Sequence, residues 1–135
     1  MIVFRKIFKK KQSLGEWGEE YAAEIYKKKG YKILDKNYFN RKGKRLGEVD
    51  FIALKDKQLA FVEVKTRTSD RFGTPAEAVG SLKQQRLRRA TKYFLLQNPE
   101  YSKYGYRIDV AELKTDLDRN AESVNIIENA VADNI

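Results

Sequence analysis

Apolar side chains near the start of the chain recur every three or four residues. The positions that share this spacing are Leu14, Trp17, Tyr21, Ala22 and Ile25. Because residues three and four apart lie on one face of an α-helix, they predict an amphipathic helix with this set as its core stripe. The stretch SLGE indicates where the helix begins, since Ser13 at the N-cap and Glu16 can form a capping box. Gly30, after three lysines, favours its end.

The pattern then changes to runs that are typical of β-strands. These runs cover residues 31–39, 48–54, 59–67, 104–113 and 123–130. The second and third are separated by four residues, most simply a hairpin that closes around positions 55–58. Apolar residues on both faces of this hairpin predict that it is central in a sheet and covered by helices on each side. The last run is expected near the edge.

A second helix is predicted between the third and fourth runs. The stretch TPAE indicates its start, with Thr74 as N-cap, Pro75 in the first helical position and Glu77 completing a capping box. We expect it to continue to about Gln97. The candidates for its buried face are Ala78, Val79, Leu82, Ala90, Tyr93 and Phe94, and its basic positions are Lys83, Arg86, Arg88, Arg89 and Lys92.

The order of elements predicts the fold class. A helix, a strand, a hairpin, a helix and two strands follow one another, and a crossover helix joins parallel strands. We therefore expect an α/β fold with a mixed sheet of four to five strands between layers of helices. At 135 residues the chain has the usual size of one domain, which we place at 13–135 after a flexible basic arm at 1–12.

Composition narrows the chemistry. The chain contains no cysteine and no histidine, which excludes disulfides, thiolate or histidine zinc sites and histidine-based catalysis. Catalysis, if present, has to use carboxylates, lysine, hydroxyl groups or a metal bound by oxygen. No apolar run approaches the roughly 18 residues of a membrane helix, and the first residues are too charged for a signal peptide. We expect a soluble, cytoplasmic protein.

Charge predicts a polyanionic partner. The net charge is +9, and the first 45 residues hold 14 basic and five acidic residues. Such an excess favours nucleic acid or an anionic membrane surface, although it also serves ordinary solubility. The short arm MIVFRKIFKKK is a weak membrane anchor, because stable anchoring needs two signals. We therefore expect no stable membrane association.

The central hairpin carries charges that a buried strand pair does not need. If it closes symmetrically, Asp50 lies opposite Glu63 and Glu48 opposite Lys65. Two acids that face each other repel, and a divalent cation would compensate for them. The Asp50 and Glu63 carboxylates, the Val64 carbonyl and waters would suit Mg²⁺ or Mn²⁺.

The two faces of the hairpin differ in what they carry. Alternation places Glu63 and Lys65 on one face, which Ile52 and Phe61 continue, and places four other side chains on the opposite face. These four are Val49, Phe51, Val62 and Val64. Lys65 would stabilise charge on a phosphate or orient the attacking water. A structural ion-pair cluster at the rim of the hairpin is the alternative.

These residues match a known pattern. Asp50, twelve residues and then Glu63-Val64-Lys65 resemble the D…ExK signature of the PD-(D/E)xK nuclease superfamily, with Val49 in place of its proline. The stretches GEWGEEYAAEIYKKKGYKIL, GEVDFIA, FVEVKTR, GTPAEAV and YRIDV are more closely similar to the YraN-like family of small bacterial proteins, which are predicted endonucleases. The resemblance spans roughly residues 13–130. It implies a restriction endonuclease-like α/β/α fold.

The resemblance also implies a function and a further site residue. A carboxylate from the first helix joins the metal site in such proteins, and GEWGE supplies it here at Glu19. We expect a metal-dependent nuclease that is structure-selective or weakly sequence-selective and acts on DNA more readily than RNA. Glu48 would pair with Lys65 or hold an outer water. The alternative is a binding or adaptor protein on the same fold without turnover, and a homodimer is open.

Basic residues around the hairpin are candidates for contacts with nucleic acid phosphates. Those expected to hold the backbone are Arg41, Lys42, Lys44, Arg45, Arg67, Arg71, Lys83 and Arg86. For Lys83 and Arg86, a solvated helix face is nearly as good an explanation.

Overall fold

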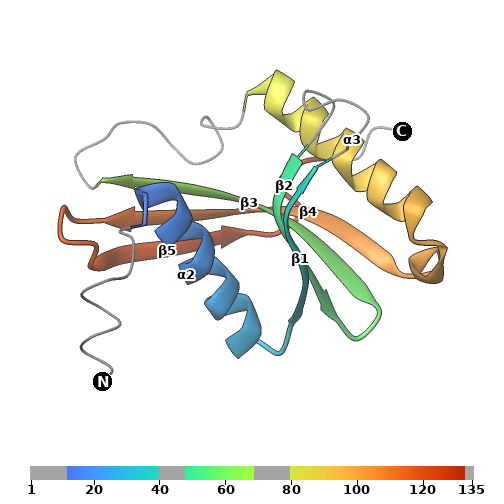
Figure 1. Cartoon of the computed structure of the whole chain (residues 1–135), viewed down its shortest axis with the longest axis horizontal. Coiled ribbons are helices and arrows are strands. Elements are labelled where there is room, and N and C mark those ends of the chain that lie inside the picture. Colours follow the sequence, from blue (N-terminus) through green and yellow to red (C-terminus); the bar gives the residue numbers. More distant parts are fainter. Residues whose placement is uncertain (1–11, 40–47, 69–79, 133–135) are drawn as a thin grey trace.

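A computed structural model describes residues 12–39, 48–68 and 80–132 (Figure 1). This part of the chain forms helices α2 (Leu14–Lys28) and α3 (Ser81–Gln97), a short 3₁₀-helix η2 (Pro99–Tyr101) and five strands. The strands are β1 (Lys32–Phe39), β2 (Glu48–Lys55), β3 (Gln58–Thr68), β4 (Gly105–Thr115) and β5 (Ala121–Ile127). The order of elements agrees with the expected one. No described helix has the length and apolar character to cross a membrane.

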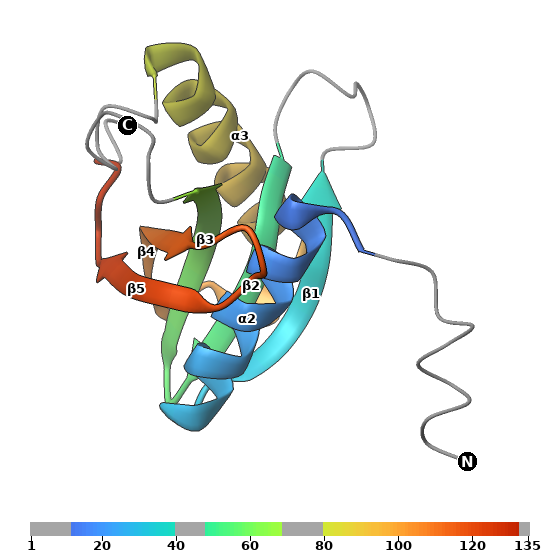
Figure 2. The same ribbon diagram turned by 90° about the vertical axis from the view of Figure 1, so that its left-hand side faces the viewer.

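The strands form one mixed sheet in the order β1-β2-β3-β4-β5. Neighbouring strands are antiparallel except for β3 and β4, which are parallel and joined through α3. Helices α2 and α3 lie on opposite faces of the sheet (Figures 1 and 2). The predicted α/β class, with a mixed sheet between helical layers, is therefore confirmed.

Each helix closes its own apolar core. On the α3 side, Ile52, Phe61 and Ile108 of the sheet pack with Leu87 and Phe94 of the helix. On the α2 side, the sheet supplies a second set that packs with small and aromatic residues of that helix. This second cluster comprises Ala22, Ala23, Tyr26, Phe51, Ala53, Ala60, Val62, Ala111 and Leu113. The central strands are thus buried on both faces, as their apolar runs predict.

Helix α2 begins as predicted but buries a different face. The Ser13 hydroxyl accepts from the Glu16 amide and the Glu16 carboxylate accepts from the Ser13 amide, both at 3.1 Å. Of the predicted stripe, Ala22 is confirmed as buried and Trp17 packs partly against the core, but Tyr21 is wrong, because it is 37% exposed. The buried residues are Gly18, Ala22, Ala23 and Tyr26. Small residues let the helix approach the sheet closely, and a Cβ at position 18 would overlap the Thr66 hydroxyl.

Helix α3 is shorter than predicted. The capping box of Thr74 and Glu77 lies outside the described residues, but one continuous helix from Pro75 is wrong, because Gly80 is extended with ψ 168°. The helix begins at Ser81. Its buried residues are Leu87, Ala90, Thr91 and Phe94, which confirms two of the predicted positions. Leu82 is 58% exposed because it lies in the first turn, before the helix contacts the core, and Ala78 and Val79 lie outside the described residues.

The N-terminal arm lies outside the described residues except for Gln12, whose carbonyl accepts a hydrogen bond of 2.6 Å from Arg119 in the β4–β5 turn.

Candidate functional site

The candidate site lies where strands β2 and β3 separate. Their paired positions run from Lys55 and Gln58 at the turn to Phe51 and Val62, so the predicted register of the hairpin is confirmed over this stretch. The next pair, Asp50 and Glu63, is not part of the ladder. Instead, the Val64 amide donates a hydrogen bond of 2.7 Å to the Asp50 carboxylate. The side chain of Asp50 thus replaces the neighbouring strand as the partner of β3.

The alternation of side chains along β2 breaks at Asp50. Val49 lies in the core beneath α3 together with Ile52, whereas Phe51 packs on the α2 side. The expectation that Val49 shares a face with Phe51 is therefore wrong. The break has the effect of a β-bulge, which re-aims a side chain at the end of a ladder. It turns the Asp50 side chain toward α2, whereas regular alternation would have placed this side chain on the α3 face of the sheet.

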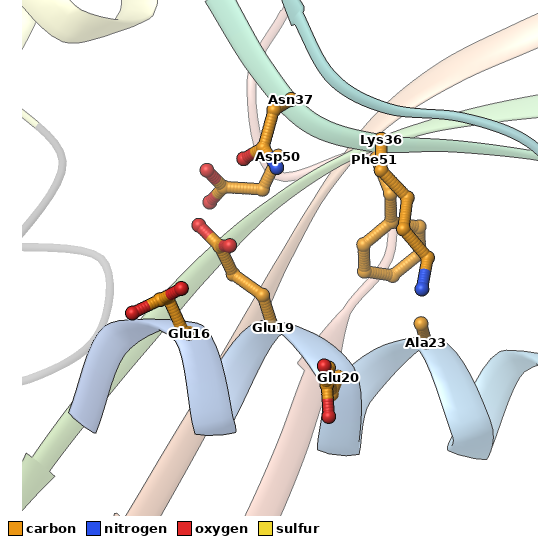
Figure 3. A pocket seen from close by; sticks show the side chains of 8 residues that line it. All are labelled: Glu16, Glu19, Glu20, Ala23, Lys36, Asn37, Asp50 and Phe51. Atoms are coloured by element: carbon orange, nitrogen blue, oxygen red, sulfur yellow. The ribbon is translucent and has the colours of Figure 1, made fainter. Parts of the chain in front are cut away.

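Three acidic side chains meet at this point. Glu19 of α2 points toward Asp50 from the opposite wall of a small pocket (Figure 3). On the other side Asp50 contacts Glu63 of β3, which is only 3% exposed. Asp50 is therefore the central member of a row that passes through the opened end of the sheet. The structure brings together the three acids that the sequence proposes.

The surroundings favour the protonated form of the two outer acids. Burial raises the pKa of Glu63 to about 8, and the hydrogen bond to Asp50 and the charge of Asp50 act in the same direction. Burial and Asp50 likewise raise the pKa of Glu19 to about 7. A protonated Glu19 or Glu63 donates to the Asp50 carboxylate, because like charges so close together cannot all be ionised without cost. A cation in the same place would relieve the same repulsion.

Residues of β1 and α2 complete the pocket. Asn37 lies across from Asp50 and has a left-handed backbone with φ 53°, a conformation that asparagine tolerates better than most residues. Its neighbour Lys36 points toward α2 beside Phe51 (Figure 3). The other lining residues are Glu16, Glu20 and Ala23. The pocket is thus acidic on the α2 side, with an amide and one lysine on the strand side.

Two lysines approach the buried acid from the α3 side. The Lys83 Nζ lies 3.3 Å from Glu63 Oε2 and 3.0 Å from Glu48 Oε1. The Lys65 Nζ lies 3.8 Å from the same oxygen of Glu63. The predicted pairing of Glu48 with Lys65 is therefore wrong. It rests on a register that ends at Phe51, and beyond that point α3 supplies the partner of Glu48.

The other basic candidates divide into two groups. The Arg67 guanidinium lies 3.3 Å from Glu112 on the adjacent strand β4, and both side chains are largely buried. Arg67 is therefore paired with an acid in this structure, and its contact with a phosphate stays a prediction. Arg86 is half-buried, and its Nε has no hydrogen-bond partner in the described part of the chain. The remaining candidates, Arg41, Lys42, Lys44, Arg45 and Arg71, lie outside the described residues.

The donors that fit a divalent ion are oxygen atoms. Across residues 12–39, 48–68 and 80–132, no group of three or more acidic side chains is arranged so that it could hold a metal ion as it stands. Mg²⁺, however, is usually held by one or two carboxylates together with waters. Asp50 and Glu63 are two such carboxylates in contact with each other. The Val64 carbonyl points to the same side of β3 as its amide, toward Asp50.

Comparison with known proteins identifies the family. The model of the uncharacterised protein family UPF0102 matches residues 18–113. The chain belongs to this family. UPF0102 proteins of Caldicellulosiruptor bescii and Caldicellulosiruptor saccharolyticus are 40% and 42% identical to it over 119 and 120 residues. These alignments cover 88% and 89% of this chain and 97% and 98% of those proteins.

A UPF0102 protein of Clostridium perfringens is 41% identical over 119 residues, which is 88% of this chain and 93% of that protein. The UPF0102 matches confirm the predicted resemblance to the YraN-like family. The region matched by the family model, residues 18–113, is narrower than the expected span of 13–130. Kinship with the PD-(D/E)xK nucleases stays a prediction.

One motif of this UPF0102 chain has a structural explanation. Asp109, within YRIDV, is fully buried and accepts hydrogen bonds from the Tyr26 hydroxyl at 2.7 Å, from Arg107 at 2.9 Å and from the Asn129 amide at 3.0 Å. Arg107 in turn donates to the Tyr31 hydroxyl. The Asp109 network joins α2 to β4 and to the segment after β5. It fixes the helix that carries Glu19.

Sequence reasoning misses two features of the UPF0102 site. It gives Asn37 no role, although asparagine within a strand-like run is a signal for a left-handed residue. It treats Lys83 as a phosphate-binding candidate and does not foresee its contact with Glu63. That contact depends on the crossover through α3, which brings residues 20 positions apart together.

Proposed function

We propose that this UPF0102 protein is a metal-dependent nuclease that hydrolyses phosphodiester bonds, with DNA as the more favoured substrate. One observation carries the proposal. Glu63 is buried against a second acid, Asp50, at the open end of a sheet, and it has two lysines on one of its oxygens. Burying acids side by side is costly, and a scaffold for binding alone gains nothing from it. A catalytic site gains from adjacent acids, because they can bind the metal ion that acts on the charged phosphate.

The residues take distinct roles in this proposal. Asp50 and Glu63 would hold Mg²⁺ or Mn²⁺ with the Val64 carbonyl, and Glu19 would assist from α2. When bound, the ion supplies Lewis acidity to the phosphate and lowers the pKa of a water. Lys65 is half-exposed at the rim, where its ammonium can stabilise negative charge on the phosphate. Asn37 and Lys36 line the same pocket as Asp50 and would orient a water or phosphate oxygen in this proposal.

The charge of the two helical layers supports a polyanionic substrate on the α3 side. Helix α3 carries five basic residues and no acidic one. Helix α2 carries four acids ahead of two lysines in its last turn. A phosphate backbone would therefore be attracted to α3 and repelled from most of α2. Since sequence inspection finds no base-reading module, structure-selective or weakly sequence-selective cleavage is the better expectation.

The test is cleavage of labelled DNA and RNA by the purified full chain. Single-stranded, duplex, flap and four-way-junction DNA are incubated with Mg²⁺, Mn²⁺ or EDTA. Wild type is compared with Asp50→Asn, Glu63→Gln and Lys65→Met. Glu24→Gln is the matched control, because Glu24 is an exposed acid on α2 that pairs with Lys27, away from Asp50 and Glu63.

Metal-dependent products that are lost in the three site variants and kept in Glu24→Gln support the nuclease. Salt-sensitive binding without products, unchanged in all variants, would leave the alternative of a binding protein on a nuclease-like fold. Products that persist in Asp50→Asn and Glu63→Gln would place the activity elsewhere or in a contaminant.

A further inference from the structure

Among the basic residues of the described ranges, Lys83 approaches Glu63 of the candidate metal site more closely than Lys65 does. Its ammonium bridges Glu63 Oε2 at 3.3 Å and Glu48 Oε1 at 3.0 Å, and its side chain is 23% exposed. Lys65, at 3.8 Å from Glu63, is farther away and more exposed. Lys83 comes from α3 and the acids come from β2 and β3. The contact therefore joins the α3 layer to the end of the sheet.

The charges of the neighbouring acids keep Lys83 protonated and strengthen its contact with them. Burial lowers the pKa of Lys83, but the charges and hydrogen bonds of Glu63 and Glu48 outweigh it and raise the pKa above its ordinary value. Lys83 is therefore charged throughout the physiological range. It supplies a positive charge to Glu63 from the α3 side, closer than that of Lys65, while Asp50 is the second acid beside Glu63.

The contacted oxygen is also a proposed metal ligand. Resting on the proposed function, we propose that Lys83 acts as an internal competitor of the metal, occupying Glu63 until a divalent cation displaces it. Two cations at one buried carboxylate repel each other, and the divalent ion attracts the acid more strongly. Glu48 is 58% exposed at its side chain and stays within reach, so the displaced ammonium remains at the rim beside the substrate path.

This competition couples metal binding to the substrate. A displaced Lys83 has left Glu63 and holds its ammonium next to the reacting phosphate, and a bound phosphate favours this displaced position. Metal and nucleic acid then assist each other's binding, as linkage requires when both favour one of two states. Lys83 is accordingly a positioning residue, which holds the Glu63 carboxylate while no metal is bound.

The first experiment measures Mg²⁺ binding by titration calorimetry at pH 9, where protons compete least with the metal. Wild type is compared with Lys83→Met and with Lys92→Met, the same substitution nine residues later on α3. We expect Lys83→Met to bind Mg²⁺ at least about fivefold more tightly than wild type, because one repelling charge near the ion is removed. Lys92→Met should bind within twofold of wild type. Unchanged or weaker binding by a folded Lys83→Met overturns the inference.

A second experiment uses the wild-type chain and needs no variant to fold. Lysine acetylation by acetic anhydride is followed by mass spectrometry with and without saturating Mg²⁺. Displacement predicts that Lys83 reacts at least about threefold faster in the metal-bound protein, while Lys92 is unchanged. Equal or slower labelling of Lys83 overturns the inference.

The two proposals fail in distinguishable ways. If wild type and both variants bind no Mg²⁺, the metal-dependent function falls and the inference falls with it. If Mg²⁺ binds and supports cleavage but neither experiment responds to Lys83, only the inference is overturned.

Discussion

Glu63 is the residue in which the conflict between stability and chemistry is clearest. The residue is 3% exposed, and burial together with Asp50 raises its pKa from 4.5 to about 8. Between these values the folded protein keeps a proton that the unfolded chain has lost. The stability contributed by the protonated acid is therefore complete below about pH 4.5 and is lost as the pH rises through about 8.

This sign predicts a falling stability of the metal-free protein from about pH 5 to pH 8. In EDTA, the free energy of unfolding should decrease by up to about 1.4 kcal/mol per pH unit for one such group. Glu63→Gln should show a flatter profile, and Glu24→Gln the wild-type one, in urea unfolding at several pH values. The chain has no histidine or cysteine, but Glu19, whose pKa is raised to about 7, also titrates in this window, so Glu63→Gln removes only part of the slope. A profile unchanged in Glu63→Gln would contradict the assignment.

Gly18 is the second residue with a sharp consequence. A Cβ at this position would overlap the Thr66 side chain, whereas a Cβ at Gly15 meets only Ser13 Oγ at 4.0 Å. Gly18→Ala should therefore lower the free energy of unfolding by about 1–3 kcal/mol through overpacking. Gly15→Ala, in the same helix, should raise it by up to about 1 kcal/mol through helix propensity. Chemical unfolding of both variants checks this, and equal effects would contradict the close approach of α2 to β3.

At the scale of elements, the docking of α2 decides where Glu19 lies. The Asp109 network holds this helix through the Tyr26 hydroxyl, at 2.7 Å from a fully buried carboxylate. Tyr26→Phe removes that donor without a large change in shape, so thermal unfolding should show a loss of about 1–3 kcal/mol. Tyr21→Phe is the control, because Tyr21 is exposed on the same helix. A Tyr26→Phe variant as stable as wild type would show that the network does not anchor α2.

Local signals explain why most elements are predictable from the sequence. The capping box at Ser13 and Glu16 and the four-residue gap at positions 55–58 act over a few residues, and both are found as expected. The buried face of α2 is not, because it depends on which side chains the sheet accepts. Large aromatic residues suggest a core stripe, but the close approach at Thr66 selects Gly18 and the small residues around it.

The candidate site likewise has features that the sequence predicts and features that it does not. The pairing of Asp50 with Glu63 follows from a symmetric hairpin, and Glu19 is added only by the family resemblance. The break of alternation at Asp50 and the contact of Lys83 with Glu63 depend on how the helices pack against the sheet. No local sequence pattern predicts them. Tertiary packing decides these features.

On the scale of the whole molecule, the charge is distributed unevenly over the two helical layers. The net charge is +9, yet α2 is acidic over its first three turns and α3 holds only basic charges. A nucleic acid that approaches the open end of the sheet therefore meets attraction on one side and repulsion on the other. Under the proposed function, this asymmetry would orient the nucleic acid backbone along α3, next to Lys83 and Glu63.

Salt dependence tests this orientation independently of cleavage. Duplex binding is measured in EDTA between 50 and 200 mM salt, where each phosphate contact contributes about 0.9 to the slope of log affinity against log salt. Arg89→Gln, at an exposed position of α3, should weaken binding and reduce the slope by about that amount. Lys28→Gln removes the same charge from an exposed position of α2 and should leave the slope nearly unchanged. Equal losses from both variants would mean that only the net charge of the molecule, and not its α3 layer, attracts the nucleic acid.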